Sequence, residues 1–267
     1  NKSDLKLHLN NSSTKVFKNP RILCLVTTQP KNHKTKALAV KETWGKACDI
    51  LYFASSEADP ELPAIAVECE SYDHDHLLCK NIKAIRYGAH KFKGRFDWLF
   101  KADDDTFAVM DNLKYLVRES DPNDAVWFGC PFALGGNRTK LYMSGGAGYA
   151  ISSEAINRLM NEFENPSKCM DWDLKRETGA DDWEIGSCLN KLNVKIGEER
   201  DAVNKKRFFP FRPEELIYPK GDFYDWFKTY NGLDCCSNKT IAFHYVSAED
   251  MYVYHFLIHH LIVKTSI

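Results

Sequence analysis

The sequence predicts an α/β protein in which helices cover both faces of a mainly parallel central sheet. In its first half, short apolar runs of strand length alternate with longer segments whose apolar residues recur at helical spacing. This alternation predicts parallel strands, because a helix between two strands returns the chain to the same edge of the sheet. The chain has 267 residues, of which 44% are hydrophobic, and this is enough apolar material for a sizeable core.

The first half is expected to fold in the order strand, helix, strand, helix, strand. Residues 1–19 are polar and are interpreted as a flexible stem. No linker rich in proline or glycine divides the chain after residue 20, so residues 20–267 are expected to form one domain. The predicted strands cover residues 21–27, 50–54 and 96–102, and the predicted helices cover residues 35–44, with Gly45 as a stop, and 77–92.

The second half contains further strands and helices. It begins with a predicted strand over residues 125–130 and a loop over residues 131–141. A helix through residues 155–163 is expected to be capped by Ser152 or Ser153, and another helix runs through residues 188–192. The strand-like run 241–246 would point His244 to the face opposite Phe243 and Tyr245. Residues 251–263 predict a packed amphipathic helix.

Nine cysteines and several glycosylation sequons favour the secretory pathway. The sequons begin at Asn10, Asn11, Asn137 and Asn238. Most cysteines are therefore expected in disulfides, with Cys69–Cys79 and Cys169–Cys188 as local pairs, and the odd count leaves at least one thiol over. Cys24 lies in an apolar run, where a small buried thiol is the simplest interpretation.

The charge balance excludes some classes of partner. Thirty-six Lys and Arg nearly cancel thirty-seven Asp and Glu, so the chain has no uniform field for a phosphate backbone, and we expect no nucleic-acid partner. No run of eighteen apolar residues is present, and the first residue is Asn rather than Met. A missing anchor in this sequence is compatible with a membrane-tethered parent protein.

Three adjacent carboxylates, Asp103, Asp104 and Asp105, directly follow the predicted strand 96–102. In an extended chain Asp103 and Asp105 lie on one side and Asp104 on the other. Open α/β sheets bind ligands at the carboxyl ends of their strands, and two converging carboxylates there would suit Mg²⁺ or Mn²⁺. The alternative is a solvated acidic turn.

Three other features allow both a functional and a structural interpretation. Asp181 and Asp182 could perform chemistry or cap the helix that follows. The glycine-rich residues 144–148 could let the backbone approach a ligand closely or form only a tight turn. His244 could bind a metal, but without a partner a structural role is the simpler interpretation.

Taken together, these segments resemble the inverting β1,3-glycosyltransferases with a GT-A fold. Within that family the chain is most similar to members that transfer galactose to N-acetylgalactosamine on glycoproteins. The matching segments occur in the family's order over roughly residues 20–255. They are RILC at 21–24, VKETW at 40–44, WLFKADDDT at 98–106, YMSGGAGY at 142–149, CCS at 235–237 and FHYV at 243–246.

The resemblance implies a Rossmann-like GT-A catalytic domain that uses UDP-galactose, Mn²⁺ and an acceptor N-acetylgalactosamine on Ser or Thr of a glycoprotein. It also implies a type II Golgi membrane protein with a lumenal catalytic domain. Asp103, Asp105 and His244 match the family's metal ligands, and Asp182 matches its catalytic base. This sequence has Asp181 where the family commonly has Glu, so Asp181 is kept as a second candidate for the base.

The resemblance also implies substrate contacts. The expected donor-binding residues are Thr27, Thr28, Lys41, Trp44, Asp103, Asp104, Gly145 and Gly146. The candidate acceptor-binding aromatics are Tyr142, Trp226 and Tyr245, each of which could equally belong to the core.

Three rival functions remain at this point. A glycoside hydrolase also uses two carboxylates around a sugar, but it needs neither a metal cluster nor a partner histidine. A member of the same family could instead transfer N-acetylglucosamine. A chaperone or lectin-like module that binds sugar nucleotides could share the fold without catalysis. A homodimer is also left open, because the sequence does not fix the oligomeric state.

Overall fold

The structure is a computed structural model, and it describes residues 19–69, 77–134, 137–165, 167, 169, 180–219 and 232–263. Trp226 and the sequons at Asn10 and Asn11 lie outside the described residues.

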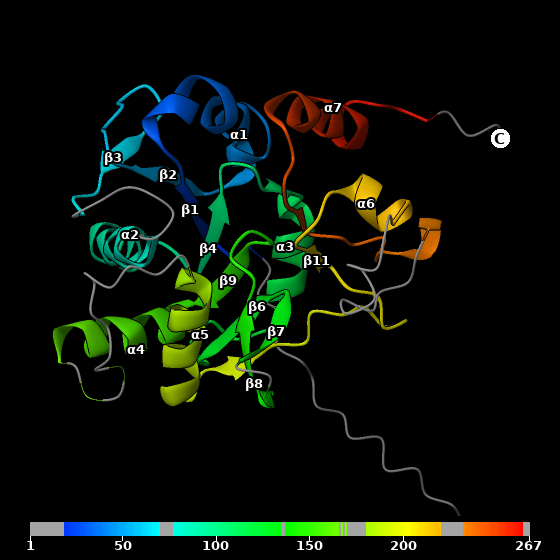
Figure 1. The fold of residues 1–267 in the computed structure, drawn as a ribbon. Helices are drawn as coiled ribbons and strands as arrows, with labels where there is room; N and C mark the ends of the chain where they lie inside the picture. Colours follow the sequence, from blue (N-terminus) through cyan, green and yellow to red (C-terminus); the bar gives the residue numbers. More distant parts are fainter. Residues whose placement is uncertain are drawn as a thin grey trace, which may run out of the picture.

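A seven-stranded sheet forms the centre of the protein (Figure 1), in the order β10-β6-β9-β4-β1-β2-β3. Its strands are β1 Ile22–Thr27, β2 Ile50–Ser55, β3 Ala64–Ala66, β4 Trp98–Asp103, β6 Val126–Gly129, β9 Tyr149–Ser152 and β10 Lys195–Ile196. Strand β9 is antiparallel to both of its neighbours, and the other pairings are parallel. The predicted mainly parallel sheet is confirmed.

Helices cover both faces of this sheet, as the sequence predicts. Strand β1 is buried along its whole length because its alternate side chains enter two different cores. One face is covered by α1 Leu38–Glu42 and α3 Met110–Val117, and the other by α2 Leu77–Lys91, α4 Ser153–Glu164 and α5 Asp181–Lys191. Because alternate side chains of a strand point to opposite faces, each face of the sheet packs against its own set of helices.

Two smaller sheets flank the central one. The first joins β11 Phe208–Phe209, β12 Ala242–Phe243 and β5 Phe107–Ala108. The second is a hairpin of β7 Pro131–Leu134 and β8 Asn137–Met143, so the prediction of a loop over residues 131–141 is wrong. The hairpin forms because Phe132 packs on Tyr142 across the strands, with ring centroids 5.8 Å apart, and Gly186 of α5 lies against Tyr142.

The predicted helix over residues 35–44 is shorter and less regular than expected. Regular α-helix covers only Leu38–Glu42, after a 3₁₀ turn at Pro30–Asn32 and a wide π-helical turn at His33–Ala37. The chain leaves helical geometry at Thr43, whose hydroxyl donates to the Ala39 carbonyl at 2.6 Å. Gly45 serves close packing, because a Cβ there would lie 2.6 Å from the Val40 carbonyl oxygen.

Helices α2 and α4 agree better with the sequence. Helix α2 matches its predicted range within a residue, and α4 contains the predicted range 155–163. Ser152 is the residue that caps α4, since its hydroxyl accepts a hydrogen bond from the Ala155 amide at 3.2 Å.

The C-terminal helix α7 Ala248–His259 confirms the helix but not its amphipathic character. Met251 is buried against the core, whereas Phe256, Leu257 and Ile258 are about half exposed. Apolar side chains therefore occur on the outer face as well as on the packed one. Nowhere in the described residues is a helix both long and apolar enough to cross a membrane.

Eight of the nine cysteines form disulfides. The predicted pairs Cys69–Cys79 and Cys169–Cys188 are confirmed, and Cys235 pairs with its neighbour Cys236. The prediction of a free Cys24 is wrong, because β1 runs beside the residues that lead into β2 and brings Cys24 to Cys48, with a Cα–Cα distance of 6.0 Å. The remaining thiol, Cys130, is buried.

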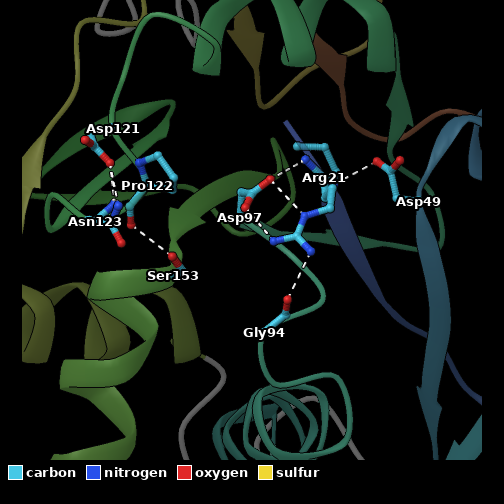
Figure 2. Close-up of polar contacts among 9 residues, drawn as sticks. Arg21, Asp49, Gly94, Asp97, Asp121, Pro122, Asn123 and Ser153 are labelled. Atoms are coloured by element: carbon cyan, nitrogen blue, oxygen red, sulfur yellow. Dashed lines mark hydrogen bonds and ion pairs between the residues drawn. The ribbon is translucent and has the colours of Figure 1, made fainter. Parts of the chain in front are cut away.

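The amino-terminal edges of β1 and β4 are held together by Arg21 and Asp97 (Figure 2). The guanidinium donates to both Asp97 oxygens, at 2.8 and 3.2 Å, and also to the Gly94 carbonyl at 3.0 Å. The Arg21 amide adds a bond of 2.8 Å to the same carboxylate, and Asp49 accepts from the Ile22 amide. These contacts set the register that brings the opposite ends of the two strands side by side.

Candidate active site

The aspartate run lies at the carboxyl-terminal edge of the central sheet. Strands β1 and β4 pair in parallel with Thr27 opposite Asp103, and the Asp104 amide donates to the Thr27 carbonyl at 3.0 Å. Thr27 and Thr28 are therefore neighbours of Asp103, Asp104 and Asp105. This is the edge at which open α/β sheets bind ligands.

Asp103, Asp105 and His244 come together from distant parts of the chain. One candidate ligand atom from each lies within 4.8 Å of the other two. The short strand β12 pairs with β5, just after the aspartates, and the Val246 amide donates to the Asp105 carbonyl at 2.9 Å. The His244 Nε2 is then 3.2 Å from Asp105 Oδ1. His244 has the partner that a functional role requires.

The local backbone differs from the strand expected over residues 241–246. Extended pairing covers only Ala242–Phe243, and Tyr245 adopts a positive φ of 57°. As a result the His244 and Tyr245 rings stack, with centroids 3.8 Å apart, and do not point to opposite faces. A positive φ at a bulky residue is unfavourable, and such strain clusters at functional sites.

Neighbouring side chains pair with both carboxylates of this cluster. Burial alone would raise the pKa of Asp105, but the hydrogen bond and charge of His244, together with Lys36 at 3.0 Å, lower it to about 2. The second carboxylate, Asp103, accepts from the Lys101 ammonium at 2.8 Å. Two carboxylates and one imidazole are a donor set that several divalent metals accept, so these residues could hold a metal ion.

Asp104 has a different role from its neighbours. One of its oxygens accepts from the Thr28 hydroxyl at 2.6 Å and from the Asn32 amide at 2.8 Å, and burial raises its pKa. Its side chain therefore joins the end of β4 to the segment that follows β1.

A cavity of about 470 Å³ opens beside the cluster, which is within the range of small-molecule sites. It is lined by Thr27, Thr28, Gln29, Leu77, Lys80, Asp103, Asp104, Asp105, His244 and Tyr245. Lys80 is only 5% exposed, and its ammonium donates to the Thr28 carbonyl at 3.2 Å. Burial lowers the pKa of Lys80, although the charges of Asp103 and Asp104 oppose this.

Asp181 and Asp182 begin helix α5 and have different surroundings. Asp182 is half-buried and accepts from the Gly145 amide and the Trp183 amide, each at 2.8 Å. Asp181 is buried and accepts from Asn81 at 2.6 Å, and burial raises its pKa to about 6. Asp182 is thus the more accessible carboxylate, and its bond to Gly145 is not a helix cap.

The glycine-rich segment packs against both acidic groups. A Cβ on Gly146 would lie 2.1 Å from His244 Cε1, and one on Gly145 would lie 3.4 Å from Asp182 Cβ and from Lys101 Nζ. Gly148 has a φ of 72°, which favours glycine. The glycines therefore permit close approach of the backbone to His244 and to the residues around Asp182.

The remaining predicted substrate residues fall in several places. Trp44 is buried, and its indole donates to the Thr106 carbonyl at 2.9 Å, while the Lys41 ammonium donates to the Glu61 carbonyl. Neither residue lines the described cavity. Tyr142 is half-buried on the β7–β8 hairpin, whereas Tyr245 is 58% exposed at the cavity.

Several polar residues of the site were not predicted from the sequence. They are Asn32, Lys36, Lys80, Asn81 and Lys101. One had a detectable signal, because Lys101 interrupts an otherwise apolar run over residues 98–102 that was predicted to be buried. The others lie on helices or turns where lysine and asparagine are ordinary surface residues.

Sequence comparisons identify relatives of this chain. A family model described as Fringe-like matches residues 17–200. The glycoprotein-N-acetylgalactosamine 3-beta-galactosyltransferase 1 of Xenopus laevis is 36% identical over 263 residues, which cover 94% of this chain and 70% of that protein. The beta-1,3-glucosyltransferase of Mus musculus is 27% identical over 204 residues, 76% of this chain and 38% of that protein.

A solved galactosyltransferase structure with donor and acceptor sugar analogues aligns with a TM-score of 0.48 and 10% identity, over 90% of this chain and 97% of that one. The family assignment does not depend on it, because the family model spans most of the chain and the Xenopus relative is similar along nearly all of it. This protein belongs to the Fringe-like family and is a glycosyltransferase.

Proposed function

We propose that the protein transfers galactose from UDP-galactose to the 3-hydroxyl of N-acetylgalactosamine on Ser or Thr of glycoproteins, with inversion, which is the core 1 β1,3-galactosyltransferase (T-synthase) reaction. The observation that supports it most is the Asp103, Asp105 and His244 cluster beside a cavity, in a chain that is 36% identical to a galactosyltransferase of that acceptor class. The GT-A family resemblance supports the same substrates.

The metal cluster is assigned to the donor. Asp103, Asp105 and His244 would hold Mn²⁺, which in this position would supply a Lewis acid for the negative charge of the departing diphosphate. Lys80 lines the same cavity, and Lys36 contacts Asp105, so both add positive charge where a diphosphate is expected. Thr27, Thr28 and Asp104, which line the cavity, are proposed to contact the donor.

Asp182 is assigned to proton transfer. As the acceptor hydroxyl attacks the anomeric carbon, its proton must pass to a base on the face away from the leaving group. The Gly145 and Trp183 amides, which donate to the two oxygens of Asp182, fix the orientation of its carboxylate. Each oxygen accepts one of these hydrogen bonds and retains a lone pair that can take a proton. Asp181 is buried and held by Asn81, which favours a supporting role.

The acceptor is proposed to contact the aromatic side of the cavity. Tyr245 supports this, since its ring is exposed at the cavity and its position is fixed by the stack on His244. Contacts from Tyr142 and Trp226 stay predictions.

The proposed location is the Golgi lumen, with a membrane anchor in the parent protein. The four disulfides support an oxidising secretory compartment.

We also propose a homodimer through the outer face of α7, which exposes Phe256, Leu257 and Ile258. In an antiparallel pair of α7 helices, the acidic Glu249 in the first turn of one helix would lie beside the partner's His259 in the last turn of the other. The positive end of each helix dipole would then lie beside the negative end of its partner, which is favourable.

The test is an assay of purified protein with Mn²⁺ and a glycopeptide that carries N-acetylgalactosamine on Thr. UDP-galactose, UDP-glucose and UDP-N-acetylglucosamine are compared as donors, and the linkage and anomeric configuration of the product are determined by NMR. We expect a β1,3-linked galactose and at least tenfold preference for UDP-galactose, as hydrogen-bonding sites discriminate strongly between sugar hydroxyls. Preference for another donor, or UDP binding without transfer, would contradict the proposal.

A further inference from the structure

Lys101 is a buried cation between the metal cluster and the helix that carries Asp182. It lies on β4, is 1% exposed, and donates to Asp103 Oδ1 at 2.8 Å. The Tyr149 ring, with its centroid 5.9 Å from the ammonium, covers another side of it. A lysine is almost never buried to this degree unless it is paired.

A second carboxylate interacts electrostatically with the same ammonium. Asp181 is 5% exposed, and the charges of Asp181 and Lys101 act on each other through the protein interior. Asp181 is itself fixed by Asn81, whose carbonyl oxygen accepts from the Thr27 hydroxyl at 2.7 Å. Lys101 therefore balances one carboxylate from the metal cluster and one from the first turn of α5.

The contact with Asp103 also affects its metal-binding geometry. The ammonium of Lys101 on Oδ1 fixes the orientation of the Asp103 carboxylate. The remaining lone pairs of the carboxylate stay available to a metal ion. The ammonium also lies close to Gly145, since a Cβ there would be 3.4 Å from Nζ, and the Gly145 amide donates to Asp182. The Lys101 side chain thus contacts a carboxylate of the metal cluster and lies close to the glycine that bonds Asp182.

We propose that Lys101 is a positioning residue that orients Asp103 for the metal ion and holds the first turn of α5, with Asp181 and Asp182, beside it. This inference rests on the proposed function of the site. The competing explanation is that Lys101 serves only to neutralise the buried Asp181 and the partly exposed Asp103, in which case its loss would affect folding stability but not metal binding.

Two variants separate these explanations. Lys101→Met removes the charge with similar volume, and it leaves Asp103 and Asp181 uncompensated, so its thermal midpoint should fall. Lys101→Met combined with Asp181→Asn removes a buried charge of each sign, and it should recover much of that loss. Asp181→Asn alone is the reference for the double variant.

The decisive measurement is Mn²⁺ affinity by calorimetry in the presence of saturating UDP. We expect the double variant to bind Mn²⁺ about 10- to 100-fold more weakly than Asp181→Asn, as is typical when a partner of a metal ligand is lost. We also expect the kcat of the double variant to fall by a larger factor than its KM for the acceptor rises. Lys114→Met is the matched control, because Lys114 forms an ion pair with Asp49, at 3.0 Å, and neither residue lines the described cavity. The Mn²⁺ affinity of this variant should equal that of wild type.

The outcomes are distinct. If the double variant regains stability and binds Mn²⁺ as tightly as Asp181→Asn does, the inference about Lys101 is wrong and the role is only structural. If the wild-type protein shows no Mn²⁺-dependent UDP binding, the proposed function itself fails. If both Lys101→Met and the double variant are folded and weak in metal binding, the positioning role is supported.

Discussion

Gly146 lies so close to His244 that a side chain at this position would overlap the imidazole: its Cβ would be 2.1 Å from Cε1 and 2.4 Å from Nε2. The imidazole is held between this backbone, the Tyr245 ring and the Asp105 carboxylate. The glycine-rich segment is therefore part of the wall that sets the direction of His244. No helix dipole or phosphate-binding loop is needed to explain its glycines.

We expect Gly146→Ala to displace His244 and weaken Mn²⁺ binding at least tenfold, with a parallel loss of turnover, because metal affinity depends on ligand orientation. Calorimetry and the galactose-transfer assay measure the two effects. Gly94→Ala is a matched control, since Gly94 has a φ of 73° with open space around it. It should cost about 1 kcal/mol of stability and leave Mn²⁺ affinity unchanged. Equal metal affinity in Gly146→Ala and wild type would exclude His244 as a ligand.

Asp105→Asn should lower donor binding and turnover together. The change removes a carboxylate whose pKa is already held at about 2 by His244 and Lys36, and thereby the charge that attracts a divalent ion. Removing the metal with EDTA should have the same effect on the wild-type protein as the substitution. UDP titrations with and without Mn²⁺ give the comparison. If UDP binds Asp105→Asn and wild type equally well in Mn²⁺, the metal assignment is wrong.

The main features of the fold and the aspartate pair could be predicted because they depend on local patterns. Alternating apolar runs predicted the chain order of strands and helices in the first half, and the alternation of an extended chain placed Asp103 and Asp105 together. The partner of His244 could not be predicted from the residues alone, because it depends on a two-residue pairing between β5 and β12 that joins positions more than 130 residues apart.

Local patterns also explain the errors. Residues 131–141 are rich in loop-forming types, yet the β7–β8 hairpin forms because a helix distant in sequence packs on it. Cys24 has the apolar neighbours of a free thiol, and only the parallel pairing of β1 and β2 reveals Cys48 as its partner. Lys101 belongs to no catalytic motif, and its one signal in the sequence is that it interrupts an apolar run.

Arg21 and Asp97 should make stability depend on pH in the acid range. Partial burial works to raise the pKa of Asp97, but the hydrogen bonds and charge of Arg21 lower it below its ordinary value. The folded state therefore binds this proton less readily than the unfolded chain, so the stabilisation is present at neutral pH. It is lost as the pH falls below about 4, through the lowered pKa.

Arg21→Met should then lower the free energy of unfolding at pH 7 by roughly 0.5–1 kcal/mol, a modest value because Arg21 is about half exposed and solvent screens the pair. The difference should shrink as the pH falls toward 2 and Asp97 is protonated, down to the contribution of the Arg21–Gly94 hydrogen bond. Urea denaturation at the two pH values measures it. Arg95→Met, whose guanidinium lies over the Phe92 ring, is the control and should show a difference that does not change with pH. A constant difference for Arg21→Met as well would rule out the ion pair as its cause.

The outer face of α7 should mediate self-association. Leu257→Glu places a charge on an exposed apolar surface, so it should disrupt the dimer while leaving the thermal midpoint of the subunit nearly unchanged. Light scattering at several protein concentrations gives the oligomeric state. Val203→Glu, at another exposed apolar side chain remote in sequence, is the matched control and should remain dimeric. A wild-type protein that is monomeric at all concentrations would disprove the dimer.

Asp182→Asn provides the most direct test of the chemistry. The amide keeps the shape of the side chain, and its oxygen can still accept from the Gly145 amide, but it cannot take the proton of the acceptor hydroxyl. Turnover should fall by about 10²- to 10⁴-fold, which is the usual contribution of a general base, while UDP and Mn²⁺ binding stay near wild type.

Asp181→Asn is the control for its neighbour. Because Asp181 is buried and bonded to Asn81, its substitution should alter stability and the local charge around Lys101, with a smaller effect on kcat than that of Asp182→Asn. Steady-state kinetics and UDP calorimetry on both variants distinguish the two carboxylates, since loss of the base lowers kcat without changing ground-state binding. If Asp182→Asn retained its kcat and Asp181→Asn lost it, the base would be the buried carboxylate, and acceptor binding would have to expose it.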